Sequence, residues 1–212
     1  MHANQTTNQL LCIVCCCLVM ACNQSAQHAP AVQRKQAYQN CLIVIQPFDN
    51  FSPDVLRIIQ DSIRNYYPVR VQINTVSALP AAAFYKPRNR YKADSIIHWL
   101  SQRKPASAIT MVGLTTQDIS TAKGSNSDFG IMGLGYQPGT ACVVSIFRLK
   151  KDSPSDALLN QRLLKSIVHE IGHNLGLPHC DNTHCLMADA KGKLNQDNEQ
   201  GFCTECMKKL PF

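Results

Sequence analysis

The stretch "HEIGHNLGLPHC" (residues 169–180) places three histidines and a glutamate within a single short segment. His169 and His173 are four residues apart, so on a helix both side chains leave the same face about one turn apart. Gly176 can adopt the left-handed conformation that commonly ends a helix. We therefore expect the chain to turn back after Gly176 and to bring His179 to the other two histidines.

Three imidazoles in this arrangement can occupy three corners of a zinc tetrahedron and leave the fourth open for water. Glu170 follows the first histidine, which places it beside the metal rather than on it. The segment also fits the extended HExxHxxGxxH pattern described for metzincins. We expect His169, His173 and His179 to bind a catalytic zinc ion, and Glu170 to be the general base for a zinc-activated water.

The residues before this motif alternate between strand-like and helix-like patterns. A strand, helix, strand, helix and strand are predicted at 41–48, 52–67, 69–76, 91–102 and 107–115. Residues 129–149 are predicted to form two more strands joined through 135–140, and a long helix opening at Ser153-Pro154 carries the histidine motif. The fold class is therefore α/β, a twisted and mostly parallel sheet with helices on its faces. Gly130 and Gly133 predict an edge strand, which we expect to be antiparallel.

Four cysteines follow the third histidine in two close pairs, Cys180 with Cys185 and Cys203 with Cys206. Such a set is a standard Cys₄ zinc site. The competing interpretation, in an exported protein, is two disulfides. We favour zinc, because a Cys203–Cys206 disulfide would have no evident structural purpose. The sequence thus predicts two zinc ions per chain, the second in a small C-terminal subdomain (residues 180–206).

The N-terminal segment predicts export. Its apolar run is too short to span a bilayer comfortably and ends in Val19-Met20-Ala21-Cys22, which is similar to a bacterial lipobox. We expect a signal peptide at 1–21, a lipid anchor on Cys22 and a flexible tether at 22–40, followed by the catalytic domain at 41–212. The predicted location is that of an exported bacterial lipoprotein, anchored to a membrane in the periplasm or at the cell surface. The alternative is a buried or disordered hydrophobic N-terminus.

Bulk composition is that of an ordinary globular protein, with 45% hydrophobic and 17% charged residues among 212. The formal net charge of +7 predicts a mildly basic surface. Lysine and arginine are not densely clustered, which argues against a nucleic-acid partner. We expect a monomer that acts on a peptide or protein substrate.

These motifs together resemble one family, the archaemetzincins, over roughly residues 41–212. The shared pattern is the extended histidine motif, a cysteine directly after its third histidine, a second cysteine five residues on, Cys-x-Met and a distal CxxC. The resemblance implies a zinc metallopeptidase, of endopeptidase or aminopeptidase type. It also implies that Met187 forms a turn beneath the catalytic zinc. By the same resemblance, Met132, Gly133 and Leu134 form the upper rim of the cleft and bind an extended peptide; the alternative for them is an ordinary edge strand.

Two other functional classes compete with the peptidase hypothesis. One is a non-catalytic zinc-binding lipoprotein that holds a partner or handles metal, and the retained Glu170 speaks against it. The other is a zinc-finger-like interaction module at residues 180–206, which leaves the histidine motif unexplained. Peptide cleavage that a chelator abolishes would separate the peptidase from both.

Overall fold

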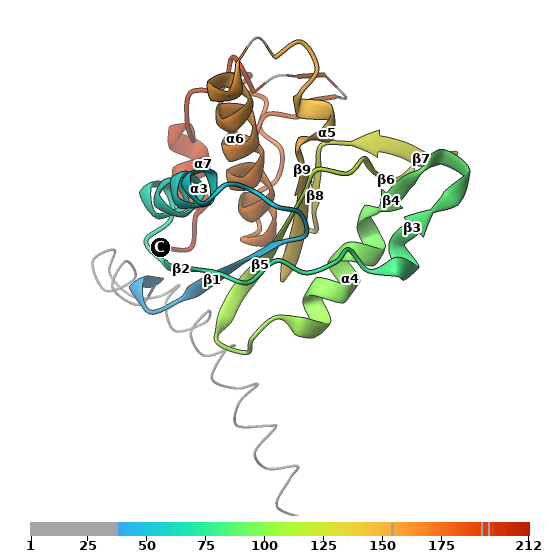
Figure 1. Ribbon diagram of the computed structural model, residues 1–212. Coiled ribbons are helices and arrows are strands. Elements are labelled where there is room, and N and C mark those ends of the chain that lie inside the picture. Colours follow the sequence, from blue (N-terminus) through green and yellow to red (C-terminus); the bar gives the residue numbers. More distant parts are fainter. Residues whose placement is uncertain (1–37, 154, 192, 195) are drawn as a thin grey trace, which may run out of the picture.

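The computed structural model describes residues 38–212 except 154, 192 and 195. Its main sheet has five strands in the order β2-β1-β5-β9-β8 (Figure 1). They are β1 (Leu42–Pro47), β2 (Arg70–Ile73), β5 (Ala108–Thr115), β8 (Gly133–Gly135) and β9 (Ala141–Ser145). All neighbours run parallel except β8, which pairs antiparallel with β9 at the edge. The predicted mostly parallel sheet with an antiparallel edge strand is confirmed.

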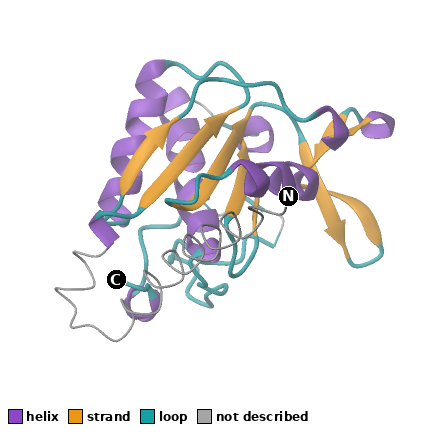
Figure 2. Ribbon diagram, turned by 90° about the horizontal axis from the view of Figure 1, so that it is seen from below, coloured by secondary structure: helices purple, strands orange, loops and turns teal. Residues whose placement is uncertain are grey.

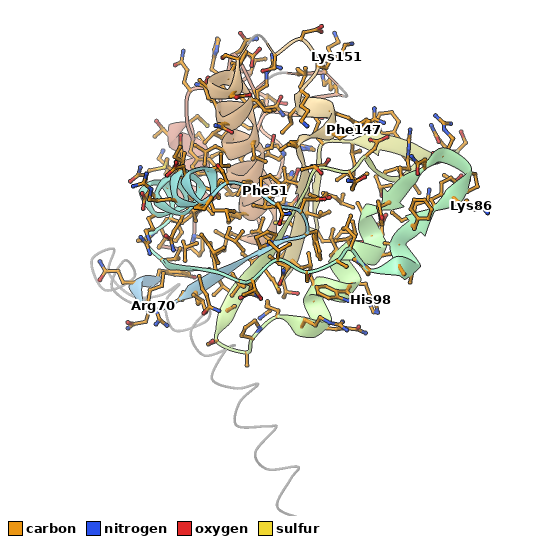
Figure 3. The ribbon with its side chains drawn as sticks, in the orientation of Figure 1. Phe51, Arg70, Lys86, His98, Phe147 and Lys151 are labelled. Carbon is orange, nitrogen blue, oxygen red and sulfur yellow. The ribbon has the colours of Figure 1, made fainter. Side chains whose placement is uncertain are left out.

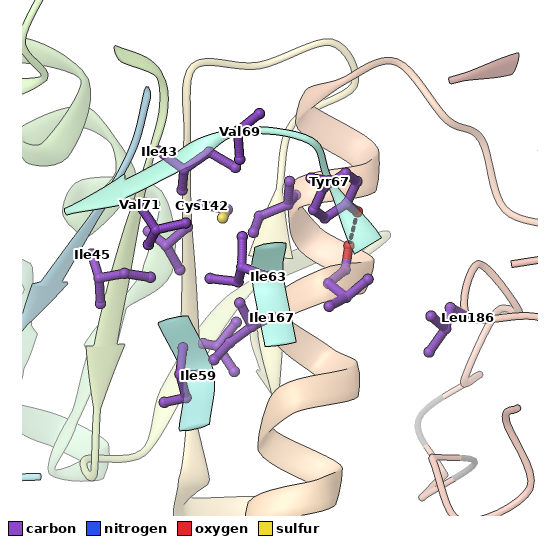
Figure 4. Close-up of a cluster of buried hydrophobic side chains, with 14 of the residues drawn as sticks. Ile43, Ile45, Ile59, Ile63, Tyr67, Val69, Val71, Cys142, Ile167 and Leu186 are labelled. Carbon is purple, nitrogen blue, oxygen red and sulfur yellow. Dashed lines mark hydrogen bonds between the residues drawn. The ribbon is translucent and has the colours of Figure 1, made fainter. Parts of the chain in front are cut away.

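Helices cover both faces of this sheet because its strands are apolar on both sides. Helices α3 (Pro53–Tyr66) and α6 (Asp156–Asn174) pack on one face, and α4 (Ala93–Arg103) packs on the other. Along β1, Ile43 and Ile45 belong to the first core cluster and Val44 to the second, as the alternation of a strand requires. Figure 4 shows the first cluster, where side chains of the sheet meet those of α3 and α6.

Helix α6 carries the histidine motif through the core, and hydrogen bonds fix both its middle and its start. The Tyr67 hydroxyl, fully buried after the end of α3, donates a 2.6 Å hydrogen bond to the Val168 carbonyl (Figure 4). The Ser155 hydroxyl caps the helix by accepting from the Leu158 amide. The helix ends at Asn174, and Gly176 follows with a φ of +95°, so the predicted stop is confirmed. Pro154, part of its predicted start, lies outside the described residues.

The sequence does not predict the second sheet, which has four short strands. Its order is β3-β4-β6-β7, with β3 (Phe84–Tyr85), β4 (Arg90–Lys92), β6 (Ile119–Lys123) and β7 (Asn126–Ile131). Strands β6 and β7 form a hairpin that extends to one side of the main sheet (Figure 2). Gly130 is predicted to share one edge strand with Gly133, but it belongs to this second sheet, because the chain changes sheets at Met132. The helix predicted at 91–102 begins only at Ala93, because the residues before it form β4.

The prediction that the last strand continues to Leu149 is wrong. Strand β9 stops at Ser145, and a short helix, α5 (Ile146–Leu149), follows it. The Ser145 hydroxyl accepts a hydrogen bond from the Phe147 amide and so caps this helix. The remaining elements are η1 (Ala81–Ala83), η2 (Lys86–Arg88) and α7 (Thr204–Lys209).

In the part of the chain that the structure describes, no helix has the length and apolar character needed to span a bilayer. The predicted signal peptide at 1–21, the proposed lipidation site at Cys22 and residues 22–37 of the predicted tether lie outside the described residues.

Candidate metal centre

The three histidines of the motif converge at one point. His169 and His173 leave the last turns of α6, and His179 reaches them after the turn at Gly176. Their ring centroids are 4.6 Å apart for His169–His173, 4.7 Å for His173–His179 and 5.5 Å for His169–His179. The Nε2 atoms of His173 and His179 are separated by 3.3 Å. The candidate ligand atoms of all three rings lie within 4.8 Å of one another.

Backbone carbonyls orient two of the rings. The Nδ1 atom of His169 lies 2.6 Å from the Leu186 carbonyl oxygen, and that of His173 lies 2.8 Å from the Leu177 carbonyl oxygen. Each Nδ1 therefore carries the proton and donates it, which leaves Nε2 unprotonated and facing the cluster. Histidines that bind a metal through one ring nitrogen regularly donate a hydrogen bond from the other ring nitrogen in this way.

The electrostatics of the cluster favour neutral imidazoles. Burial lowers the pKa of His169 to about 3, and repulsion from His173 adds to the effect. Burial also lowers the pKa of His173, as does its neighbour His179. Because metal binding requires unprotonated nitrogen, three converging neutral imidazoles are a donor set that fits zinc.

Glu170 lies beside this cluster, on the wall of the same cleft. Its side chain is almost buried, and it accepts a hydrogen bond from the Gly135 backbone N–H on β8. Burial raises the pKa of Glu170 to about 8, and the bond from Gly135 partly opposes that shift. A β-carbon placed on Gly133 would lie 2.6 Å from Glu170 Oε1, so the edge strand passes directly over the carboxylate.

Met187 packs under the motif. Its side chain is fully buried, and a β-carbon placed on Gly172 would lie 2.6 Å from its sulfur. The glycine between the two helical histidines in sequence thus makes room for the methionine. The Met187 carbonyl also accepts a 2.8 Å bond from the Cys180 amide, which joins this turn to the cysteines.

The four C-terminal cysteines also come together. Their sulfur atoms lie within 4.8 Å of one another, all four are free, and the Cys180 and Cys203 sulfurs are 3.7 Å apart. A tetrahedron of sulfurs about 2.3 Å from zinc has edges of roughly 3.8 Å. Amides of Met187 and Cys203 donate to the Cys185 sulfur at 3.5 and 3.3 Å. The cluster therefore fits zinc better than it fits two disulfides.

A cleft of about 760 Å³ opens over the histidines and Glu170. One wall is formed by β7, by β8 and by Met132 between them, so the predicted rim residues Met132, Gly133 and Leu134 all line it. Residues 188–191 also line the cleft. An extended peptide could lie along the β8 edge, close to both the histidines and the carboxylate.

Comparison with known proteins agrees with this geometry. The model of a family described as "Peptidase family M54" matches residues 38–211. This chain belongs to peptidase family M54. Archaemetzincins from Archaeoglobus fulgidus and Pyrococcus furiosus are 32% and 31% identical to it, each over 80% of this chain and over 99% and 92% of their own lengths. The predicted family is therefore confirmed, and this M54 member is a zinc metallopeptidase.

Solved structures show the same fold. The crystal structure of the Archaeoglobus fulgidus archaemetzincin complexed with malonate has a TM-score of 0.66 and 29% identity, over 79% of this chain and 99% of that one. The archaemetzincin from Methanopyrus kandleri has a TM-score of 0.68 and 27% identity, over 81% and 94%. The M54 chain therefore keeps the family fold along nearly the whole length of these relatives.

The same comparison overturns one prediction. The matched relatives are archaeal archaemetzincins and are not lipoproteins, so the classification as a lipoprotein with a signal peptide is wrong. The family match covers residues 38–211, so the lipobox-like pattern at residues 19–22 has no counterpart in the matched part of these relatives. The monomeric state and the absence of a nucleic-acid partner stay predictions.

Two residues that support the M54 site are missed by the sequence analysis. The Asn174 side chain accepts a 2.6 Å bond from the Thr110 hydroxyl and donates a 3.0 Å bond to the Tyr136 carbonyl, which holds the chain after β8 against α6. Gly135 supplies the amide that contacts Glu170. Asn174 lies four residues after Glu170 and so on the same face of α6, which is the signal that could have identified it.

Proposed function

We propose that this M54 peptidase hydrolyses peptide bonds in the 760 Å³ cleft with Glu170 as its general base. The observation that carries the proposal is the position of Glu170. Its carboxylate opens into the cleft next to His169 and His173, yet it does not belong to the group of converging ligand atoms. A carboxylate in this place can reach a water molecule without competing for the metal.

Zinc held by the three histidines would supply a Lewis acid that lowers the pKa of water and polarises the scissile carbonyl. Glu170 accepts the proton of the attacking water and returns it to the leaving amine. Burial raises the pKa of Glu170 to about 8, and the +2 charge of a zinc ion beside it would bring that pKa down toward the range in which the carboxylate accepts a proton at neutral pH. The Gly135 amide holds the carboxylate in place during both transfers.

Edge strand β8 provides the binding surface for the peptide. Gly133 and Leu134 lie on an edge whose other side is already paired with β9, so one row of backbone groups faces the cleft. An extended substrate adds to such an edge by main-chain hydrogen bonds. Small residues at Gly133 and Gly135 let the strand pass close to Glu170.

The proposal includes a second zinc ion at the four cysteines, with a structural role. Its support is the 3.7 Å separation of the Cys180 and Cys203 sulfurs and the amide hydrogen bonds to Cys185. The Cys206 amide and neighbouring sulfurs lower the pKa of Cys203 to about 7, whereas burial raises the pKa of Cys185 and of Cys206, so the charge of a zinc ion would supply the stabilisation that the remaining thiolates need. This site fixes the segment that carries Met187 below the histidines.

Digestion of a peptide library tests the proposal. The zinc-loaded protein should cleave peptides, a chelator should abolish cleavage, and added zinc should restore it. Mass spectrometry of the products separates cleavage inside peptides from stepwise removal of terminal residues, and so assigns endopeptidase or aminopeptidase type. A protein with a filled histidine site that cleaves no peptide would instead be a zinc-binding protein without catalysis.

A further inference from the structure

Arg148 is a cation fixed in the wall of the cleft. It lies on α5, and its Nε and Nη2 atoms donate to the two carboxylate oxygens of Asp118 at 2.8 and 3.0 Å. A guanidinium has five N–H groups, so this bidentate contact leaves three. The side chain is 35% exposed and lines the cleft. Its remaining N–H groups are therefore available to a ligand there, and the guanidinium is held in one orientation.

The position of Arg148 along the cleft follows from two glycines. A β-carbon on Gly130 would lie 2.0 Å from Arg148 Nη2, so the guanidinium rests against the backbone of β7. Three residues later, Gly133 touches the carboxylate of Glu170. Gly130 is on β7 and Gly133 begins β8, with Met132 between the strands, so the two contacts are separated by three residues of chain, at most about 10 Å. A substrate that runs along the same wall would thus present to Arg148 a group two or three residues from its scissile bond.

Asp118 does not need Arg148 for charge neutralisation. Arg90 already pairs with Asp118 at 3.1 Å, and its side chain is only 10% exposed. Arg90 and Lys92 also pair with Asp128, which is equally buried. Three cations thus face two carboxylates in this network, and the most exposed of the three cations, Arg148, lines the cleft. The one excess positive charge of this network therefore lies at the cleft.

Other cations also line the same cleft. Among the described residues, exposed lysines on three separate segments line the cleft without an ion pair: Lys123, Lys151, Lys191 and Lys193. Figure 3 marks Phe147 and Lys151, which lie on α5 and just after it, next to Arg148 in sequence. Phe147 is half exposed and adds an apolar surface beside the guanidinium.

We propose that Arg148 binds a carboxylate of the substrate, two or three residues from the scissile bond, and so makes acidic peptides the preferred substrates. The inference rests on the proposed function for the identity of the ligand as a peptide. The carboxylate is either an Asp or Glu side chain or the free C-terminus of a short peptide, because both present the same planar pair of oxygens. Asp118 and Gly130 are positioning residues, since they hold the guanidinium in place.

Paired peptides test this proposal and distinguish the two sources. In one arm, Glu is compared with Gln at each of the three positions on either side of the cleaved bond. In the other, a free C-terminus is compared with its amide. Wild type should favour the charged member of at least one pair by about tenfold or more in kcat/KM, mainly through KM. The measured quantity is the ratio of kcat/KM for the charged peptide to that for its neutral partner. Arg148→Gln should bring this ratio close to one, and Arg148→Lys should retain part of the preference. The exposed control Arg57→Gln should leave the ratio unchanged.

Two further measurements keep the test decisive. Lys151→Glu changes an exposed cleft residue that makes no ion pair with any described acidic side chain, so it should fold and lower the same ratio even where Arg148→Gln is unstable. Fluorescence anisotropy with a labelled acidic peptide and its amide counterpart measures binding to zinc-loaded Glu170→Gln protein without turnover. Preferential binding of the acidic peptide supports the proposal even if hydrolysis fails. A wild-type ratio near one in both arms, or a ratio unaltered in folded Arg148→Gln, overturns it.

Discussion

Gly133 lies so close to Glu170 that a β-carbon on the glycine would be 2.6 Å from the carboxylate Oε1. The edge strand and the Glu170 carboxylate therefore occupy positions that depend on each other. Replacing Gly133 adds a methyl group where the carboxylate now lies, so either the side chain or β8 must move.

Gly133→Ala should therefore lower kcat/KM while the protein stays folded and keeps its zinc. Misplacement of a catalytic group by about 1 Å can cost around 100-fold, and we expect a loss of that order. Gly201→Ala is the matched control, because a β-carbon there meets no atom within 4 Å. Steady-state kinetics and circular dichroism measure both variants. Full activity in Gly133→Ala would show that the close approach does not position Glu170.

The two metal sites should respond separately to mutation. His169→Ala removes one of three nitrogen ligands and should cost the histidine-bound zinc, whereas the cysteine site keeps its ion. Metal analysis should fall from two zinc ions per chain to one. His98→Ala is the control, since that histidine is exposed on α4 (Figure 3), which packs on the opposite face of the main sheet from α6. A single zinc per chain in wild type, together with mapped disulfides among the four cysteines, would contradict the two-zinc proposal.

The carboxylate of Asp128 should make the free energy of unfolding depend on pH. Burial raises its pKa, but hydrogen bonds from Ser120 and Lys92 and the nearby Arg90 outweigh burial, so the pKa is lowered below 3.8. A carboxyl group whose pKa is lower in the folded state stabilises the fold above its unfolded pKa, and this contribution is lost as pH falls through the folded pKa. The free energy of unfolding should thus be lower for Asp128→Asn than for wild type at pH 7, and the difference should shrink below about pH 4.

Urea unfolding at several pH values measures this difference. Asp61→Asn, in an exposed pair with Arg64, serves as the control and should differ little from wild type at any pH. A gap between Asp128→Asn and wild type that stays constant down to pH 3 would show that the Asp128 carboxylate is not the source of the effect.

The histidine motif could be read from the sequence because helical spacing and one glycine determine its geometry locally. His169 and His173 must share a face when they lie four apart on a helix, and Gly176 ends that helix where the spacing requires. The parallel sheet was also predictable, since long apolar strands alternated with amphipathic helices.

The second sheet could not be predicted in the same way. Strands β3 and β4 contain two and three residues, too few to show a period of two. They exist because β4 pairs with β6, nearly thirty residues later, and because Arg90 is buried against Asp118 and Asp128. Such distant contacts leave no local signal. The same reason hides Arg148, whose role depends on Asp118 and Gly130, which come from two other segments.

The central claim is that Glu170 is the base for peptide hydrolysis, and Glu170→Gln tests it most directly. Glutamine keeps the size of the side chain and removes its ability to accept a proton. We predict a folded protein with the zinc content of wild type and a kcat lowered by about 10²–10⁴. Glu205→Gln, an exposed glutamate on α7, should match wild type in the same peptide assay. Cleavage by zinc-loaded Glu170→Gln at the wild-type rate would contradict the account.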